Sequence, residues 1–138
     1  MKNLIVAHYF DGRRLKGETS SFSPEKATFF IDNDETGLHK EVYLSELKAV
    51  YFVKNLEGNP KYRKKIDTGK EGFGKKVRIF FHDGETLVGY TATFSLHKLG
   101  FFITPNDPKS NNERIFVISK ATDKIENIDG DIVQTFLH

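Results

Sequence analysis

The sequence predicts an all-β protein of two tandem five-stranded small barrels, which arise from an internal duplication and are joined by a basic linker. Three observations lead to this expectation. Short apolar runs alternate with turn residues at intervals of about 8 to 12 residues, one half of the chain repeats the other, and positive charge gathers between the halves. The expected organisation is a first barrel at 1–57, a linker at 58–75 and a second barrel with a C-terminal segment at 76–138.

The repeat appears when the chain is shifted against itself by 72 residues. Across residues 11–31 and 83–103, eleven of 21 positions are identical without a gap. Beyond this window, residues 42–44 align with 115–117 at an offset of 73, and Val50 aligns with Ile125 at an offset of 75. We therefore interpret the chain as one module that occurs twice.

Each module contains five expected strands. In the first they cover 3–10, 14–21, 27–32, 41–44 and 49–53, and in the second 76–82, 86–93, 100–104, 114–119 and 124–127. A single helical turn capped by Ser45 is expected at residues 45–48. Because a module of about 60 residues buries only about 60% of its unfolded surface, we expect the two barrels to pack on each other through aromatic residues. The apolar segment 128–138 is expected to pack on the barrels or on a second copy.

An Asp-Gly pair separates the first two strands of each module, and a glycine lies in the middle of the second strand. Asp-Gly supplies the positive φ that a tight hairpin turn needs. The strand glycine permits a bend or the close approach of another backbone. For the two Asp residues a turn role is favoured over catalysis. The structural turn residues are Asp11, Gly12, Gly17, Asp83, Gly84 and Gly89.

This order of strand, Asp-Gly turn, glycine-containing strand, loop and apolar strand resembles the first motif of Sm-like proteins, the family that includes bacterial Hfq. SH3-like barrels share much of the pattern. The resemblance covers residues 4–31 and 77–103 and implies a small-barrel fold. It argues against the family's RNA pocket, because the expected Asn and Arg-Gly are absent. Their places hold Ala27 and Leu99, and residues 44–45 and 118–119. The chain is also similar to an uncharacterised bacterial protein family.

Composition excludes several classes of function. There are 21 Lys+Arg against 19 Asp+Glu, and Cys is absent, which removes disulfides, thiolate nucleophiles and cysteine-based metal sites. The five His show no metal-ligand spacing. No apolar stretch is long enough to span a bilayer. We therefore expect no enzyme activity, no metal or other cofactor, no membrane insertion and a cytoplasmic location.

Two segments are candidate binding sites. The basic linker combines cations and an aromatic residue in a pattern typical of nucleic-acid or anion binding, although a solvated linker explains it as well. Its candidate residues are Lys61, Tyr62, Arg63, Lys64, Lys65, Lys75 and Lys76. The loop at 104–113 is longer than its counterpart and is a candidate interaction loop, or an ordinary turn-rich connection. Its candidate residues are Asn106, Asp107, Asn111 and Asn112.

Three functions are consistent with these features. The first is a non-catalytic bacterial interaction or adaptor protein, whose open strand edges or aromatic patches bind a protein partner. The second is binding of RNA or single-stranded nucleic acid through the basic linker. The third is a small-molecule sensor with its ligand between the barrels. A homo-oligomer is compatible with all three.

Overall fold

The chain consists mainly of β-strands in the part that its computed structural model describes, namely residues 2–57, 74–92, 98–105, 107 and 109–127, with the backbone of 132–135. The first half contains β1 (Asn3–Tyr9), β2 (Arg14–Thr19), β3 (Thr28–Asn33), β4 (His39–Tyr43), the 3₁₀ turn η1 (Leu44–Glu46) and β5 (Leu47–Val53). The second contains β6 (Lys75–Phe81), β7 (Thr86–Thr91), β8 (Gly100–Pro105), β9 (Asn112–Ile118), η2 (Ser119–Ala121), β10 (Thr122–Asn127) and β11 (Ile132–Thr135). The all-β prediction is confirmed.

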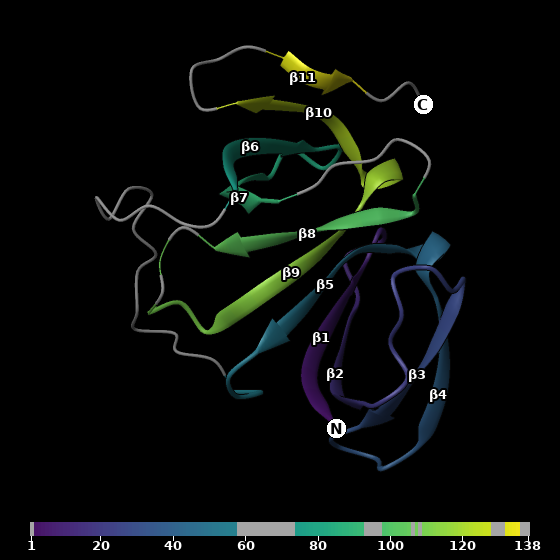
Figure 1. Ribbon diagram of the computed structural model, residues 1–138. Coiled ribbons are helices and arrows are strands. Elements are labelled where there is room, and N and C mark those ends of the chain that lie inside the picture. Colours follow the sequence, from purple (N-terminus) through teal and green to yellow (C-terminus); the bar gives the residue numbers. More distant parts are fainter. Residues whose placement is uncertain are drawn as a thin grey trace.

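The strands form one antiparallel sheet in the order β11-β10-β6-β7-β8-β9-β5-β1-β2-β3-β4. The two halves share a strand order, β5-β1-β2-β3-β4 in the first and β10-β6-β7-β8-β9 in the second. The pairing of β5 with β9 joins them, and β4 and β11 lie at opposite ends of the molecule (Figure 1). This topology is an open sheet, so the closure of each half into a barrel stays a prediction.

Glycines allow the sheet to bend within each half. The ladder between β2 and β3 has two residue pairs, and one of them joins Gly17 to Asn33. A Cβ atom on Gly17 would overlap the carbonyl oxygen of Asp32. In the second half a Cβ atom on Gly89 would overlap the side chain of Ile103. Both glycines therefore permit the close approach that the sequence predicts.

The hairpin turns predicted at the two Asp-Gly pairs are present. Gly12 has a φ of +91° and Gly84 a φ of +93°, which is the left-handed conformation that glycine adopts without strain. Asp11 Oδ1 accepts a hydrogen bond of 3.0 Å from the backbone N–H of Arg13. Asp83 Oδ1 accepts one of 3.0 Å from the backbone N–H of Glu85. Both carboxylates therefore close their own turns.

The predicted helical turn at 45–48 is wrong in two respects. The turn is a 3₁₀ turn that begins at Leu44, and the preceding residue Tyr43 makes no side-chain cap hydrogen bond. Lys48 lies in β5, where it is buried. A second such turn, η2, follows β9 and begins at Ser119, the last residue of the strand expected at 114–119.

The alignment of the fourth strands at an offset of 73 is also wrong. Phe29 pairs with Val42 in the first half, and its counterpart Phe101 pairs with Val117 in the second. Val42 therefore corresponds to Val117, at an offset of 75. A slip of two residues keeps every side chain on the same face of the strand. Apolar alternation alone could not distinguish the two offsets.

The C-terminal segment adds a strand that the sequence did not predict. β11 pairs antiparallel with β10, with Lys124 opposite Thr135 and Ile125 opposite Gln134. This agrees with the expectation that the segment packs on the rest of the chain. As a result, β11 covers the outer edge of β10.

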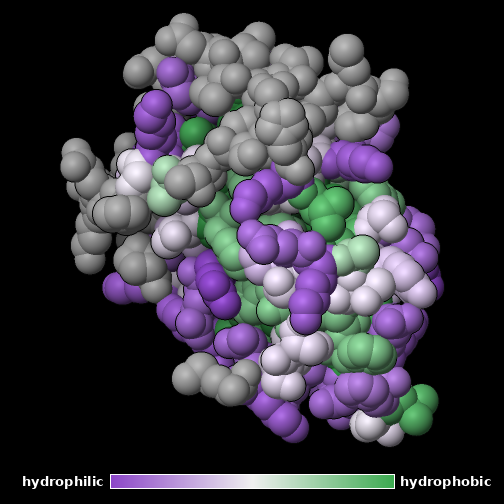
Figure 2. Space-filling view, turned by 45° about the vertical axis from the view of Figure 1, so that its right-hand side comes forward, coloured by the Kyte–Doolittle hydropathy of each residue, from purple (hydrophilic) through white to green (hydrophobic). Residues whose placement is uncertain are grey.

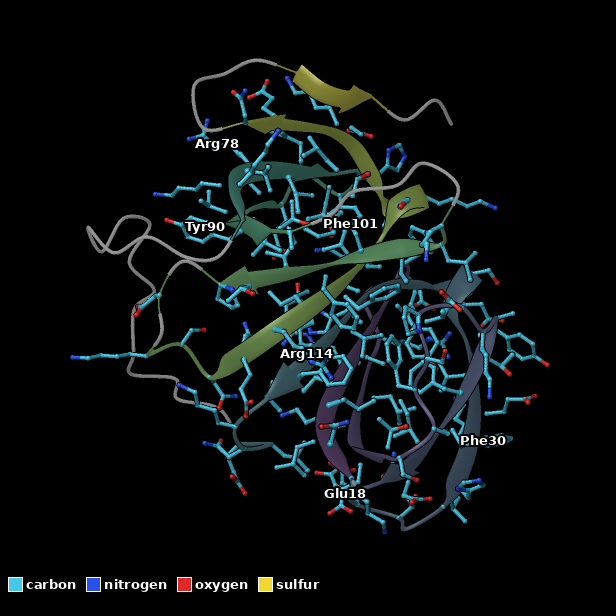
Figure 3. All side chains as sticks on the ribbon, in the orientation of Figure 1. Glu18, Phe30, Arg78, Tyr90, Phe101 and Arg114 are labelled. Carbon is cyan, nitrogen blue, oxygen red and sulfur yellow. The ribbon has the colours of Figure 1, made fainter. Side chains whose placement is uncertain are left out.

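One hydrophobic core runs through both halves, and aromatic rings join them. The Phe22 ring lies 5.3 Å from that of Phe52 in the first half and 5.2 Å from that of Phe116 in the second. Arg114 stacks between the halves, with its guanidinium carbon 4.3 Å from the Phe52 ring centre and 4.7 Å from that of Phe102 (Figure 3). The expected aromatic packing between the halves is confirmed.

None of the helical segments in the described residues is long and apolar enough to cross a membrane.

Candidate functional site

The predicted nucleic-acid site falls mainly outside the described residues. Lys61, Tyr62, Arg63, Lys64 and Lys65 all belong to the undescribed segment 58–73. Lys75 and Lys76 open β6, so Lys75 belongs to a strand and not to the predicted linker. They pair with Thr91 and Tyr90 of β7. The structure therefore places these two lysines on the second half of the sheet.

The predicted interaction loop is held by contacts within the chain. Asn106 lies outside the described residues. Asp107 is buried, and its Oδ1 accepts a hydrogen bond of 3.0 Å from the backbone N–H of Lys109. The Asn111 side chain binds the backbone of Asn55 twice, donating to its carbonyl at 3.0 Å and accepting from its N–H at 3.2 Å. Asp107 and Asn111 therefore have structural contacts, and Asn112 opens β9.

An unpaired strand edge is the first candidate binding surface. The backbone N–H of Asn33 donates to the carbonyl of Leu38, and the backbone N–H of Leu44 donates to the carbonyl of Ala27. Asn33 with Leu38 and Ala27 with Leu44 are therefore hydrogen-bonded residue pairs, one at each end of the β3–β4 ladder. In an antiparallel ladder such pairs alternate, so Lys40 and Val42 direct their N–H and C=O groups toward β3. The next strand position beyond β4 is empty among the described residues. The other three β4 residues are His39, Glu41 and Tyr43. Their backbone N–H and C=O groups therefore point away from β3, toward the open edge.

Side chains around this edge are unusually exposed. Among the described residues, three of the five exposed large hydrophobic side chains lie on the β3–β4 hairpin, namely Phe30, Leu38 and Tyr43. Figure 3 shows Phe30 at the outer side of this hairpin. The His39 ring stacks on Phe30 at 4.5 Å and also contacts Asp32 at 2.7 Å. Tyr43 donates a hydrogen bond of 3.1 Å to Glu41. The edge therefore combines backbone groups that have no strand partner in the described part of the chain with aromatic and charged side chains.

The corresponding edge in the second half is occupied. Phe30 pairs with Glu41, and its counterpart Phe102, at the offset of 72, pairs with Phe116. Glu41 therefore corresponds to Phe116. Phe116 lies opposite Val50 of β5 and is buried. β9 holds the same position in its half as β4, and it pairs antiparallel with the extended strand β5.

A charged cluster forms at the junction of the halves. Lys48 Nζ lies 2.7 Å from Asp83 Oδ2 and 2.8 Å from Glu85 Oε1, and it lies over the Phe81 ring at 4.6 Å. The hydrogen bond from Lys48 lowers the pKa of Asp83. Burial raises the pKa of the nearby Tyr51 phenol, and the charge of Glu85 adds to the increase. Tyr51 therefore stays neutral in the physiological range.

A groove of about 300 Å³ lies beside this cluster. Its floor includes Val6, His8 and Tyr51, and the His8 and Tyr51 rings lie 4.2 Å apart. Arg14 and Lys16 of β2 line it on the first half, and Glu85 lines it on the second. Asn111 and Asn112, two residues of the predicted interaction loop, also line the groove. The sequence did not indicate the groove itself, because it depends on the pairing of β5 with β9.

A metal site receives no support from the described residues. Within them, no three His, Asp or Glu side chains are grouped so that they could hold a metal ion. On the face shown in Figure 2, apolar residues lie among hydrophilic ones. The open β4 edge and the junction groove are therefore the two candidate sites.

These features define a small all-β protein with a repeated strand order, a β4 edge without a strand partner among the described residues, and a groove where its halves meet. The chain belongs to a family of unknown function, DUF6982, whose model matches residues 1–129. Comparisons with curated proteins and with solved structures give no match.

Proposed function

We propose that the chain is a non-catalytic interaction protein that binds an extended segment of a partner protein along β4. One observation carries this proposal. The outward backbone groups of β4 have no strand partner among the described residues, whereas β9, which holds the same position in the second half, binds β5 along that edge. Addition of a strand to an open sheet edge is a common mode of peptide recognition.

Side chains at the edge define the chemistry of the partner. In antiparallel addition, the partner residue opposite Glu41 lies on the same face as Phe30 and Glu41. A Lys or Arg at that position would be attracted to the Glu41 carboxylate. Residues two positions away would face Tyr43 and His39, where an apolar or aromatic side chain gains contact area. The preferred partner segment therefore carries a basic residue with an apolar residue two positions before it and another two positions after it, all on one face.

The same charges disfavour pairing between two copies of β4. A symmetric antiparallel pair that uses all three outward residues places Glu41 opposite the Glu41 of the other copy. Like charges directly opposite each other destabilise a strand pair. Charged residues on edge strands are a common protection against such self-association. The edge is therefore suited to a different chain with complementary charge.

Peptide selection followed by backbone substitution tests the proposal. Extended peptides of random sequence are selected on the immobilised chain, and their affinities are measured for the wild type and for Glu41→Pro. Proline removes the outward N–H of residue 41, and an edge strand tolerates it because that N–H donates to no strand. We expect affinity to fall at least about tenfold, since a backbone hydrogen bond and the fit of the edge are lost together.

Glu41→Gln is the matched control, because it keeps the N–H and removes the charge. We expect a smaller loss with Gln than with Pro, and a preference for basic residues among peptides selected on the wild type. Peptides that bind the Glu41→Pro variant as well as the wild type would contradict the proposal, provided that thermal unfolding shows that the variant is folded.

Several finer interpretations belong to this proposal. The shared strand order of the halves and the eleven identical positions support a tandem duplication of one module that resembles an Sm-like barrel. An adaptor role in the cytoplasm is part of the same proposal.

A further inference from the structure

We propose that the junction groove is a second binding site, which takes a small planar aromatic anion. This site is separate from the β4 edge, since β4 and the groove-lining strands β1, β2 and β5 are different parts of the sheet. Its volume of about 300 Å³ is at the lower end of the range for small-molecule sites.

The floor of the groove suits a flat apolar ring. Val6 of β1 lies opposite Lys16 of β2 on one side and Tyr51 of β5 on the other, so these three side chains form one row across the sheet. His8, in the next row, stacks against Tyr51 with an interplanar angle of 38°. Val6 and Tyr51 are buried, while His8 is half-buried. Aromatic and aliphatic surface of this kind favours stacking with a planar ligand.

The wall formed by β2 supplies positive charge. Arg14 and Lys16 are two residues apart on one strand, so their side chains project from the same face of the sheet. Both are exposed, and neither forms an ion pair with another described residue. By contrast Arg13, which directly precedes Arg14, pairs with the Asp11 carboxylate at 2.6 Å. An arginine guanidinium binds a carboxylate through two parallel hydrogen bonds, which favours a planar anionic group.

The acidic residues of the groove do not reverse this preference. Glu85 accepts hydrogen bonds from Lys48 at 2.8 Å and from the Tyr51 hydroxyl at 3.5 Å, and it shares Lys48 with Asp83. This cluster therefore keeps one net negative charge, against the two positive charges of Arg14 and Lys16. Glu57 lies beyond Val53, the last residue of β5. Arg14 instead pairs with His8, which lies opposite Ala49 near the start of β5. Arg14 therefore lies at the end of the groove away from Glu57, and Lys16 lies one row closer to that residue.

Benzoate, benzamide and cyclohexanecarboxylate are suitable probes, because they separate the contribution of charge from that of the planar ring. Binding is followed by amide chemical-shift changes on the isotope-labelled full chain. We expect benzoate to bind with a dissociation constant on the order of 1 mM, as befits a ligand of this size. We expect binding at least about fivefold weaker for benzamide and for cyclohexanecarboxylate, with shifts centred on β1, β2 and β5.

The variant Arg14→Gln/Lys16→Gln should abolish saturable benzoate shifts without lowering the thermal midpoint, because both side chains are exposed. Arg78→Gln is the control, since Arg78 lies on β6 away from the groove (Figure 3) and should leave binding unchanged. Equal affinity for benzoate and benzamide, or binding that survives the double substitution, would overturn the proposal. Loss of peptide binding in the Glu41→Pro variant should leave benzoate binding unchanged, so a failure of one proposal can be told from a failure of the other.

Discussion

Glu41 and Phe116 hold the same position in the two halves of the sheet, yet Glu41 is exposed at an open edge and Phe116 is buried between the halves. Phe116 lies opposite Val50 and packs against Phe22 and Phe102 at 5.2 and 5.0 Å. The same strand position therefore lies at a joint inside the chain in one half and at a surface that meets solvent in the other.

Removal of the Phe116 ring should destabilise both halves together. We expect Phe116→Ala to lower the free energy of unfolding by about 3–5 kcal/mol, because the ring is buried in a core that both halves share. Chemical denaturation followed by circular dichroism measures this loss. A loss below about 1 kcal/mol would show that the joint contributes little to stability.

The reciprocal change should make the open edge associate. Glu41→Phe places a large apolar side chain beside exposed Phe30 and removes the charge that opposes self-pairing. We expect little change in the thermal midpoint but concentration-dependent dimers or larger species in analytical ultracentrifugation. Glu46→Phe, outside the strand edge in η1, is the comparison variant. A monomeric Glu41→Phe protein would argue that residue 41 does not control pairing at this edge.

Much of this arrangement follows from the sequence. The features that could not be predicted from it depend on contacts between residues far apart in the chain. Asp-Gly turns and strand glycines are local signals, so they located the hairpins and the bends. Pairing of β5 with β9 is a long-range contact between strands that look alike, and nothing local specifies it. The groove depends on that pairing, so it was not predictable. The sequence predicts open strand edges in general, but the strand order of the sheet was needed to identify β4 as such an edge.

Acid should weaken the junction through Asp83. Its folded-state pKa lies below the ordinary value of 3.8, chiefly because Lys48 donates to it. A carboxylate of this kind adds stability that is fully present above the unfolded-state pKa and is lost as the pH falls through that value toward the folded-state pKa. We expect the pH dependence of unfolding below about pH 4 to flatten in Asp83→Asn and in Lys48→Met. An unchanged slope in Lys48→Met would exclude Lys48 as the cause.

Deletion of the C-terminal strand should expose the edge of β10. In a chain that ends at Asp129, residues Lys124, Ile125 and Glu126 lose their partners on β11. We expect a lower thermal midpoint or a change in oligomeric state, since an uncovered edge is open to new pairing. Calorimetry and ultracentrifugation of the shortened and full chains measure the two effects. If both remain unchanged, β11 does not stabilise the sheet.

Amide hydrogen exchange along β4 tests the central claim most directly. In the free chain, the N–H groups of His39, Glu41 and Tyr43 face the open edge and should exchange faster than those of Lys40 and Val42, which face β3. Addition of a selected peptide should slow the three outward amides and leave the inward ones nearly unchanged. If a bound peptide slows amides elsewhere and leaves those of His39, Glu41 and Tyr43 as fast as before, β4 is not the edge that receives a partner.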